Sequence, residues 1–491
     1  MRSLRRWLIP LALLPVLAGA GWLWFEGSGS GPQPPAAAAD CPLLELAGAV
    51  EPGALQLPAE DQLTWLNSHV RVTGELTVSY THHLGRYGQL TLSAGGRMHH
   101  PNNGSCTTPF DHGPRFIVID DGSREQNPEP VPFLQEQPTI RSGSTVTDLA
   151  GWFTEEPVYM ADSGFADWFV LQPERLTVQP AARPLIAPDP GGSLQVAGFN
   201  VENYFTTLGS RGARSSRELE RQHTKLVAAL AGLNAQLIGL AEVENDEGET
   251  LRHLLNSRDG LPAVTGQPWQ WLQGEGFGRG SDDIGLAFVY RSDLLAPVGP
   301  TLSDTHPVHE RPPLLQRFRE LATGFEFTVV MTHLKSRGGC ASFDRDTGSG
   351  CWNERRDSQV RQLLTFLSQH DAQHGSGLLL LGDLNAYALE EPVQRLISAG
   401  FTDLLARHVP ATERYTYIWQ PGVAGYIDHA LADSELLGYV CGADIWHINA
   451  DEPTVLSWSA ARFGPDLYSP DPFRSSDHDP VLVGLDPSGK C

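Results

Sequence analysis

Short groups of acidic, amide and histidine residues recur along the sequence, each directly after an apolar run. In chain order they are Asn200-Val201-Glu202-Asn203, Glu242-Val243-Glu244, His333-Leu334-Lys335-Ser336-Arg337, Asp383-Leu384-Asn385, Asp428-His429 and Asp477-His478-Asp479. Hard divalent cations prefer oxygen ligands such as carboxylates, and histidine moves protons near neutral pH. Hydrolysis of a phosphodiester requires such a cation, a general base and help for the leaving oxygen. These residue types therefore indicate metal-assisted phosphodiester hydrolysis.

The apolar runs before these groups predict the strands that position them. The expected strands cover residues 194–199, 237–240, 284–290, 325–332, 377–381, 426–431 and 481–485. Apolar residues at helical spacing predict helices over 217–231 and 354–370. Alternating strands and helices are typical of a layered α/β domain, in which active sites form at strand ends. Residues 194–487 are therefore expected to form an α/β catalytic domain.

Residues 41–180 show a different pattern, with short β-like runs and no long helix. The runs cover residues 70–80, 88–92, 116–119, 144–153 and 168–178. Turn-rich pieces such as PNNG and DDGS separate them. Many short strands predict a small β-barrel or sandwich. A Pro- and Gly-rich break at 180–193 separates this region from the α/β domain.

The N-terminus predicts export. Three arginines within the first six residues precede an uncharged apolar run over 7–25, which has about the length that spans a bilayer as a helix. Ala18-Gly19-Ala20 suits signal peptidase, whereas Trp22, Trp24 and Phe25 resemble the aromatic belt of an uncleaved anchor. Residues 1–26 are thus expected to be a signal peptide or a signal anchor, and 27–40 a flexible linker. The protein would be secreted, or held at the periplasmic face of a bacterial membrane.

The composition limits the partners that the protein can have. The 491 residues are 41% hydrophobic, which is enough for real cores and argues against a disordered chain. With 35 basic and 58 acidic side chains, the net charge is 35 − 58 = −23. Such a chain is a poor passive binder of nucleic acid, because it offers no basic surface that releases counterions. A metal-dependent nucleic-acid enzyme stays possible, since a bound metal supplies the phosphate contact.

Because export would bring the chain into an oxidising compartment, the six cysteines are expected to form disulfides. Cys340 and Cys351 enclose a short loop rich in glycine and aspartate, so they are the first expected pair. Cys41–Cys106 and Cys441–Cys491 follow from their proximity in the sequence.

The order and spacing of the polar groups resemble those of the endonuclease/exonuclease/phosphatase superfamily over residues 195–485. The opening GFNVENYF, the HLKSRGG segment with its nearby cysteines, and SGSTVTDLAGWFTEEP in the front region most resemble extracellular bacterial nucleases with an N-terminal OB-like domain. The resemblance implies a four-layer, deoxyribonuclease-like α/β sandwich of two packed sheets flanked by helices. It also implies that residues 41–180 form a small all-β, OB-like domain in front of it.

The resemblance also implies roles for individual residues. Glu242 would be the first metal ligand, and Asn200, Glu202 and Asp477 would lie on the metal side of the site. His478 would be the general base, oriented by Asp428. Asp383 and Asn385 would position the attacking water and bind a phosphate oxygen, and His333 would bind phosphate or protonate the leaving oxygen. Asp283 is the nearest carboxylate that could be the partner of His333, and Lys335 and Arg337 could neutralise substrate phosphates. His429 and Asp479 are expected to face away from the site, because side chains alternate along a strand.

The leading hypothesis is therefore an exported nuclease that uses Mg²⁺, with Mn²⁺ or Ca²⁺ as alternatives, and that acts on DNA, with RNA as the alternative substrate. A second hypothesis keeps the metal and the histidines but changes the substrate to a lipid or sugar phosphate, because the superfamily also contains sphingomyelinases and inositol-phosphate phosphatases. A third, non-enzymatic hypothesis is an adhesion module with an inactive catalytic domain. The intact set of catalytic matches argues against it.

Overall fold

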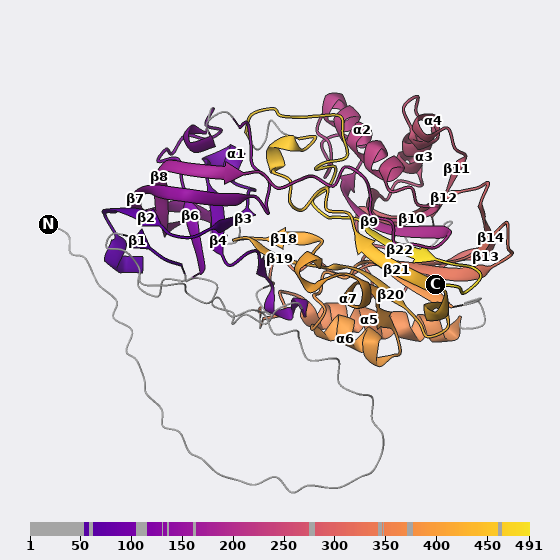
Figure 1. Cartoon of the computed structure of the whole chain (residues 1–491). Coiled ribbons are helices and arrows are strands. Elements are labelled where there is room, and N and C mark those ends of the chain that lie inside the picture. The colour runs from indigo at the N-terminus through magenta and orange to yellow at the C-terminus, as the bar shows by residue number, and fades with distance from the viewer. Residues whose placement is uncertain are drawn as a thin grey trace, which may run out of the picture. The chain divides into compact units, whose positions relative to one another are not determined.

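Two six-stranded β-sheets carry the C-terminal part of the chain in this computed structural model (Figure 1). Across the first sheet, the strands are β11 (Trp269–Leu272), β12 (Ile284–Arg291), β10 (Leu237–Glu244), β9 (Leu194–Tyr204), β22 (Val481–Leu485) and β21 (Val440–Ile445). Across the second, they are β13 (Leu295–Ser303), β14 (Leu314–Glu320), β15 (Glu326–His333), β16 (Leu378–Asp383), β20 (Asp428–Ala432) and β17 (Thr402–Asp403). Each sheet contains one parallel pair, β9 with β10 and β15 with β16.

The two sheets face each other across one hydrophobic core. Val196 and Phe288 of the first sheet share a buried cluster with Val329 and Leu381 of the second. The other face of the first sheet packs on α2 (Ser216–Gly232), α3 (Glu249–Asn256) and α4 (Leu261–Thr265). The other face of the second sheet packs on α5 (Asn353–Gln369) and α6 (Glu391–Ser398), as Figure 1 shows. The short helix α7 (Leu404–His408) contributes to the core between the sheets. This mixed α/β sandwich is the fold that the sequence predicted.

Burial on both faces explains why the central strands are apolar without interruption. Neighbouring residues of a strand point to opposite faces of the sheet. Val196 of β9 accordingly enters the core between the sheets, while Ala197 packs toward the helices. α2 begins where Ser215 caps it by accepting a hydrogen bond from the backbone N–H of Glu218.

A second β structure precedes the sandwich. Its strands are β1 (Ala54–Leu55), β2 (Ser68–Val72), β3 (Leu76–Tyr80), β4 (Leu90–Ala94), β6 (Phe116–Ile119), β7 (Thr145–Met160) and β8 (Gly164–Gln179), and it includes the one-turn helix α1 (Leu84–Tyr87). β7 pairs with both β3 and β8, so five strands close into a ring in the order β7, β3, β4, β6, β8. A closed ring of strands is the arrangement of a barrel. The expected single run at 70–80 is broken in two, because Gly74 adopts a φ of +86°.

One strand of the front region pairs with the catalytic part. β18 (Tyr417–Trp419) and β19 (Val423–Gly425) form a hairpin, and β5 (Met98–His99) pairs with β19 in parallel. Asn103, which is fully buried, donates through Nδ2 to the carbonyl of Arg414 at 2.8 Å. Its Oδ1 accepts from the backbone N–H of Tyr426, also at 2.8 Å. Residues 98–103 thus hold the segment that leads into β20.

The structure describes residues 54–57, 62–104, 115–129, 131–134, 137–160, 164–273, 280–341, 346, 348–370, 377–459 and 464–491. All of them belong to one compact unit, Ala38–Cys491. The expected signal or anchor at 1–26, the linker at 27–40 and the Cys41–Cys106 pair lie outside the described residues. No helix in the described ranges is long and apolar enough to cross a membrane.

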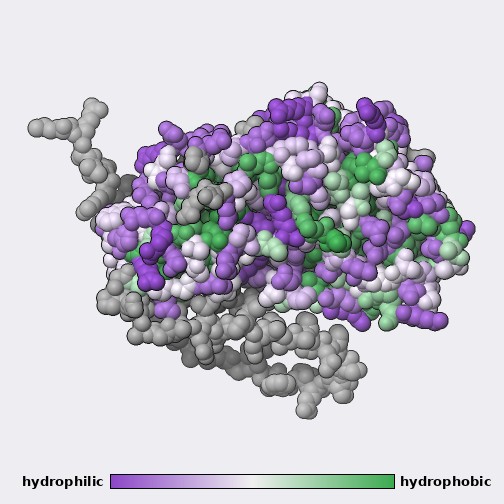
Figure 2. All heavy atoms as spheres, turned by 45° about the horizontal axis from the view of Figure 1, so that its top comes forward, coloured by the Kyte–Doolittle hydropathy of each residue, from purple (hydrophilic) through white to green (hydrophobic). Residues whose placement is uncertain are grey.

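The surface mixes polar and apolar residues. On the face that Figure 2 shows, hydrophobic residues form small separate groups among hydrophilic ones. The most exposed large hydrophobic side chains are Leu185 and Ile186, at 76% and 84%, in the connection between the front region and the sandwich.

Candidate active site

The strand registers bring three of the predicted catalytic residues side by side. His333 ends β15 and pairs with Asp383 at the end of β16. Asp383 in turn pairs with Asp428, the first residue of β20. All three side chains are almost fully buried, with exposures of 2% to 3%. His333, Asp383 and Asp428 therefore lie in a row across the ends of three neighbouring strands of the second sheet.

Local bends in the first sheet direct acidic groups toward this row. Glu242 has a φ of +67° and lies where the pairing of β10 shifts register with both of its neighbours. Glu202 and Asn203 also have positive φ, at +53° and +51°. Such conformations cost roughly 1–3 kcal/mol each in residues other than glycine and concentrate at functional sites. The Glu242 carboxylate is fixed by the backbone N–H of Asn203, which donates to Oε2 at 3.0 Å.

Asp383 joins the two sheets of the site. Its Oδ2 accepts from Nδ2 of Asn200 at 3.1 Å and lies 3.3 Å from Nε2 of His333. Its Oδ1 accepts from the backbone N–H of Asn385 at 2.8 Å. Burial by itself would raise the pKa of Asp383, but the hydrogen bond and charge of His333, with help from His478, hold that pKa well below its usual range. Asp383 is therefore a carboxylate at any physiological pH.

His478 and Asp428 form a buried dyad. Nδ1 of His478 lies 2.8 Å from Oδ2 of Asp428. Nε2 of the same ring faces the acidic cluster, 3.9 Å from Asp477 and 4.0 Å from Asp383. Burial opposes protonation of His478, yet Asp428 and Asp477 raise its pKa well above 6.5. The ring also packs against Tyr417, with centroids 4.9 Å apart. One nitrogen is thus anchored while the other is aimed at the place where chemistry would occur.

The acidic groups of the site fit a divalent cation. Oε2 of Glu202 is buried without a hydrogen-bond partner among the described residues. Burial, and then the charge of Asp477, raise the pKa of Glu202 to about 8, with Glu242 adding to the repulsion. A cation would relieve this crowding of carboxylates. Oδ1 of Asn200 accepts one hydrogen bond, from the backbone N–H of Glu202 at 3.1 Å, which leaves its second lone pair for a cation.

A second group can also offer metal ligands. Oxygen or nitrogen atoms of Asp383, Asp428 and His478 lie within 4.8 Å of one another. The sequence assigned these three residues to water activation rather than to the metal. The structure therefore places the possible ligands on both sides of one small site rather than only at Asn200, Glu202, Glu242 and Asp477.

The structure does not bring Asp283 to His333. The Asp283 side chain is 72% exposed and lies 3.8 Å from Arg211. Nε2 of His333 instead lies 3.2 Å from Nη1 of Arg311. That guanidinium lies 4.0 Å from Asp282, whose side chain is only 17% exposed. The register was misjudged by one residue, and an arginine stands between the acid and the histidine.

Arg311 is the residue of this site that the sequence did not reveal. It is 5% exposed and also donates from Nη2 to the carbonyl of Leu334 at 2.6 Å. It precedes Pro312 and Pro313 in a segment without a helix or strand pattern, so nothing in the local sequence marks it.

Arg337 is not available to bind substrate phosphate as the sequence suggested. Its Nη1 pairs with Oε2 of Glu390 at 2.5 Å, and the two side chains are 8% and 0% exposed. The guanidinium also lies over the ring of Tyr387, 4.4 Å from the centroid. The distant acid Glu390 could not be recognised as its partner from the sequence. Lys335 remains a candidate for binding substrate phosphate, because its side chain is partly exposed. Its Nζ lies 5.4 Å from the ring centroid of Trp352.

Replacing Arg337 by methionine is expected to lower stability by roughly 3–5 kcal/mol, because it leaves the Glu390 carboxylate buried without its partner. Urea unfolding of the purified protein measures this change. Lys335→Met is the matched control and should keep the wild-type midpoint while raising KM. An Arg337→Met protein with unchanged stability and a raised KM would instead restore Arg337 to phosphate binding.

Cys340 and Cys351 form a disulfide, as do Cys441 and Cys491, and the sequence predicted both of these pairs. The backbone N–H of Cys351 donates to the carbonyl of Arg337 at 3.1 Å. Trp352 follows directly and donates through Nε1 to the carbonyl of Gly339 at 3.0 Å. The disulfide therefore holds the ring over which Lys335 lies.

The Cys340→Ser/Cys351→Ser variant is expected to stay folded and to lose activity mainly through a raised KM. By the chain-entropy estimate, the link contributes roughly 2–3 kcal/mol. Steady-state kinetics of protein made in an oxidising compartment tests this. The Cys441→Ser/Cys491→Ser variant is the control for losing a disulfide elsewhere. Equal KM values in wild type and the first variant would mean that the loop needs no covalent constraint.

Two residues beside the catalytic positions point elsewhere, as the sequence predicted. Nε2 of His429 lies 2.8 Å from the carbonyl of Ala386. Asp479 accepts from the backbone N–H of Asn449 at 2.7 Å and lies 3.0 Å from His447.

The fold and this edge of buried acids and histidines define a hydrolase of phosphate esters. The family model described as "Endonuclease/Exonuclease/phosphatase family" matches residues 197–478, which is more than half of the chain. The chain therefore belongs to the endonuclease/exonuclease/phosphatase family, whose members act on phosphodiesters or phosphate esters.

Solved structures of the family are similar to this chain over the sandwich. The human nocturnin catalytic domain is 17% identical, with a TM-score of 0.38, and the match covers 59% of this chain and 93% of that one. A Bacteroides thetaiotaomicron mannosyl-6-phosphatase is 16% identical, with a TM-score of 0.38 and coverages of 60% and 99%. A Danio rerio TDP2 complexed with a single-strand DNA product is 14% identical, with a TM-score of 0.39 and coverages of 59% and 97%. No curated protein matches the sequence.

Proposed function

We propose that this protein is an exported, divalent-metal-dependent nuclease that cleaves DNA and, as a second substrate, RNA. The observation that carries the hydrolytic part is the His478–Asp428 dyad, because the free nitrogen Nε2 is aimed at the acidic cluster beside Asp383. A nucleic-acid substrate is supported by Lys335, which follows His333 by two residues and lies over the ring of Trp352, the residue after the disulfide-bonded Cys351. A cationic side chain there would meet the phosphates that flank the cleaved bond.

Each residue of the site would have its own role in hydrolysis. A cation beside Asp477 would offset one of the charges that raise the pKa of His478 and so favour its neutral ring. Nε2 of that neutral ring takes a proton from the attacking water, while Asp428 keeps the ring oriented and stabilises the charged form that results. Asp383 and Asn385 hold the water in line, and His333 with Arg311 supports the leaving oxygen. Glu242, Glu202 and Asp477 would hold the cation. When bound, Mg²⁺ or a similar ion would polarise the phosphate and neutralise its charge.

The front barrel is proposed to be of the OB type. In chain order, the ring strands β3, β4, β6, β7 and β8 are joined 1-2-3-5-4-1, and β6 runs parallel to β8. Five-stranded barrels of the OB type bind oligonucleotides or oligosaccharides in many proteins. Fold alone does not assign that role here.

Export is supported by the two disulfides of the described residues, since disulfides persist in oxidising compartments. Cell fractionation separates the two forms of export. Activity in the medium would indicate a cleaved signal, and activity in the membrane fraction would indicate an anchor.

Incubation of the purified protein with supercoiled plasmid, linear duplex, single-stranded DNA and RNA tests the proposal. Mg²⁺, Mn²⁺ and Ca²⁺ are compared, with a chelator as control. Cleavage that stops on chelation is expected. The alternative is a phosphodiesterase or phosphatase of lipid or sugar phosphates, so sphingomyelin and sugar phosphates are assayed in parallel. Faster turnover of these than of any nucleic acid would replace the nuclease by this alternative.

A further inference from the structure

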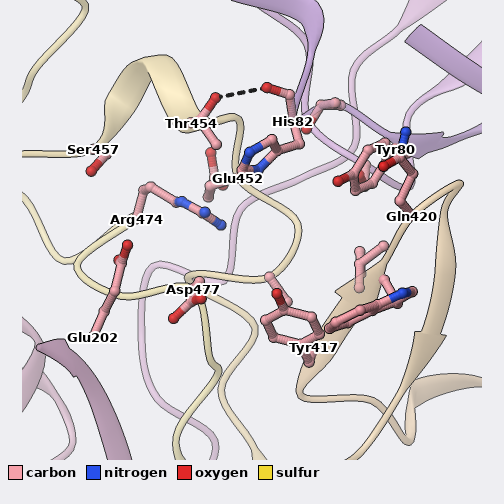
Figure 3. A pocket seen from close by; sticks show the side chains of 15 residues that line it. Tyr80, His82, Glu202, Tyr417, Gln420, Glu452, Thr454, Ser457, Arg474 and Asp477 are labelled. Carbon is pink, nitrogen blue, oxygen red and sulfur yellow. Dashed lines mark hydrogen bonds between the residues drawn. The ribbon is translucent and has the colours of Figure 1, made fainter. Parts of the chain in front are cut away.

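A cavity of about 210 Å³ opens directly beside the proposed metal site. Glu202 and Asp477 form its end nearest the chemistry, and both belong to the sandwich. Tyr80 and His82 of the front region line it as well, as does Tyr417 of the catalytic hairpin (Figure 3). We call this cavity the junction pocket. Residues from both parts of the chain therefore enclose the space next to the reacting groups.

Aromatic side chains form two walls of the junction pocket. Tyr417 and Trp419 come from β18, with ring centroids 5.8 Å apart. Tyr80 and His82 come from the front region, with rings 5.9 Å apart and nearly parallel at 14°. Because Tyr417 also packs against His478, the first wall reaches the catalytic dyad itself. Flat aromatic faces at this place suit a planar ring system of the substrate.

Arg474 supplies the positive charge of the junction pocket. It is 7% exposed, and its Nε is buried without a hydrogen-bond partner among the described residues. Nη1 donates to the carbonyl of Asn449 at 3.1 Å, and within the described part of the chain no carboxylate lies within ion-pairing distance of the guanidinium. The third acid of the pocket, Glu452, is already paired with Arg141 and Arg183. Arg474 therefore retains hydrogen-bonding capacity that an anionic group of the substrate would use.

Hydrogen bonds hold the wall formed by Tyr80 and His82 against the sandwich. The carbonyl of His82 accepts from Oγ1 of Thr454 at 3.0 Å, as the dashed line in Figure 3 marks. The backbone N–H of Ser142 donates to the carbonyl of Asp451 at 2.9 Å. On the opposite side, β5 pairs with the β18–β19 hairpin that carries Tyr417 and Trp419. The two walls are therefore fixed in position by the same contacts that join the two parts.

We propose that the junction pocket binds the nucleotide next to the cleaved phosphate, with its base on Trp419 and Tyr80 and its phosphate at Arg474. This inference rests on the proposed nuclease function and extends it, because it assigns the front region a direct share in the substrate site. Stacking on aromatic side chains tolerates any base, so the pocket favours nucleotides over other phosphodiesters without selecting a sequence.

The test compares esters that have one defined cleavable bond. The p-nitrophenyl esters of thymidine 5′-phosphate and thymidine 3′-phosphate carry a base on either side of the bond, and methyl p-nitrophenyl phosphate carries none. The wild-type protein should favour at least one thymidine ester over the methyl ester by about tenfold or more in kcat/KM, as expected for one stacked base. Trp419→Ala should remove most of that preference, and Trp419→Phe should keep it. Trp152→Ala removes an aromatic side chain of the front region that is 43% exposed and should also keep it.

The outcomes separate this inference from the function on which it rests. If DNA and RNA are cleaved but the wild-type protein shows no preference for a base, the junction pocket does not bind the nucleotide. The same conclusion follows if the preference survives in Trp419→Ala. If nucleic acids are not cleaved while lipid or sugar phosphates are, the nuclease function is wrong, and this inference is wrong with it.

Discussion

Replacing Glu242 by glutamine is expected to lower kcat by roughly 10³-fold or more, the upper range for losing one strong electrostatic contact to the transition state. Glutamine has nearly the shape of glutamate and can still accept one of the two hydrogen bonds that Glu242 receives from Asn200 and Asn203. What disappears is the negative charge that would hold the cation. The loss should therefore appear in catalysis and not in folding.

Single-turnover cleavage at saturating Mg²⁺ measures this effect, and thermal unfolding checks that the fold is retained. Glu249→Gln is the matched control, because Glu249 lies a few residues further along and its side chain is 72% exposed. That variant loses the same charge at the surface and should cleave like the wild type. Near-normal turnover of Glu242→Gln would exclude Glu242 as an essential metal ligand.

His478→Ala is expected to lose more than the roughly 10²–10⁴-fold that removal of a general base alone produces. The ring does more than accept a proton, since it lies between Asp428 on one side and Asp383 and Asp477 on the other. Without it, three carboxylates face one another and the water loses its position. Asp428→Asn should give a smaller loss, because the ring stays in place but its orientation and charged form are less well supported.

The informative measurement is which variant loses more activity, His478→Ala or Asp428→Asn. The kcat of both is measured across pH, and His69→Ala, which removes a half-exposed histidine, serves as the control. Full activity of Asp428→Asn would show that another carboxylate orients the imidazole.

Much of the catalytic half could be predicted because its central strands are buried on both faces. Their unbroken apolar runs reveal both the strands and the polar residues at their ends. α2 was placed within a residue or two, since its apolar spacing and the cap at Ser215 agree. By contrast, the edge strand β13 was missed, because Pro297, Gly299 and Pro300 interrupt its apolar residues and most of its side chains are partly or fully exposed.

The parts of the site that could not be predicted depend on contacts between distant residues. Nothing near Arg337 indicates that Glu390 neutralises it, and only the folded chain brings Arg311 to His333. The choice between Asp282 and Asp283 depends on which carboxylate the strand turns inward, which a shift of one residue reverses. Sequence patterns locate strand ends well, but they do not determine which partner a charged side chain finds.

The contacts of Asn103 have a consequence for when activity can arise. This residue is bonded to backbone groups 311 and 323 positions later in the chain. Contacts over such separations form late, because a very long loop must close first. His478 follows still later in the chain. A chain that is still being synthesised therefore cannot bring its catalytic groups together until His478 has left the ribosome.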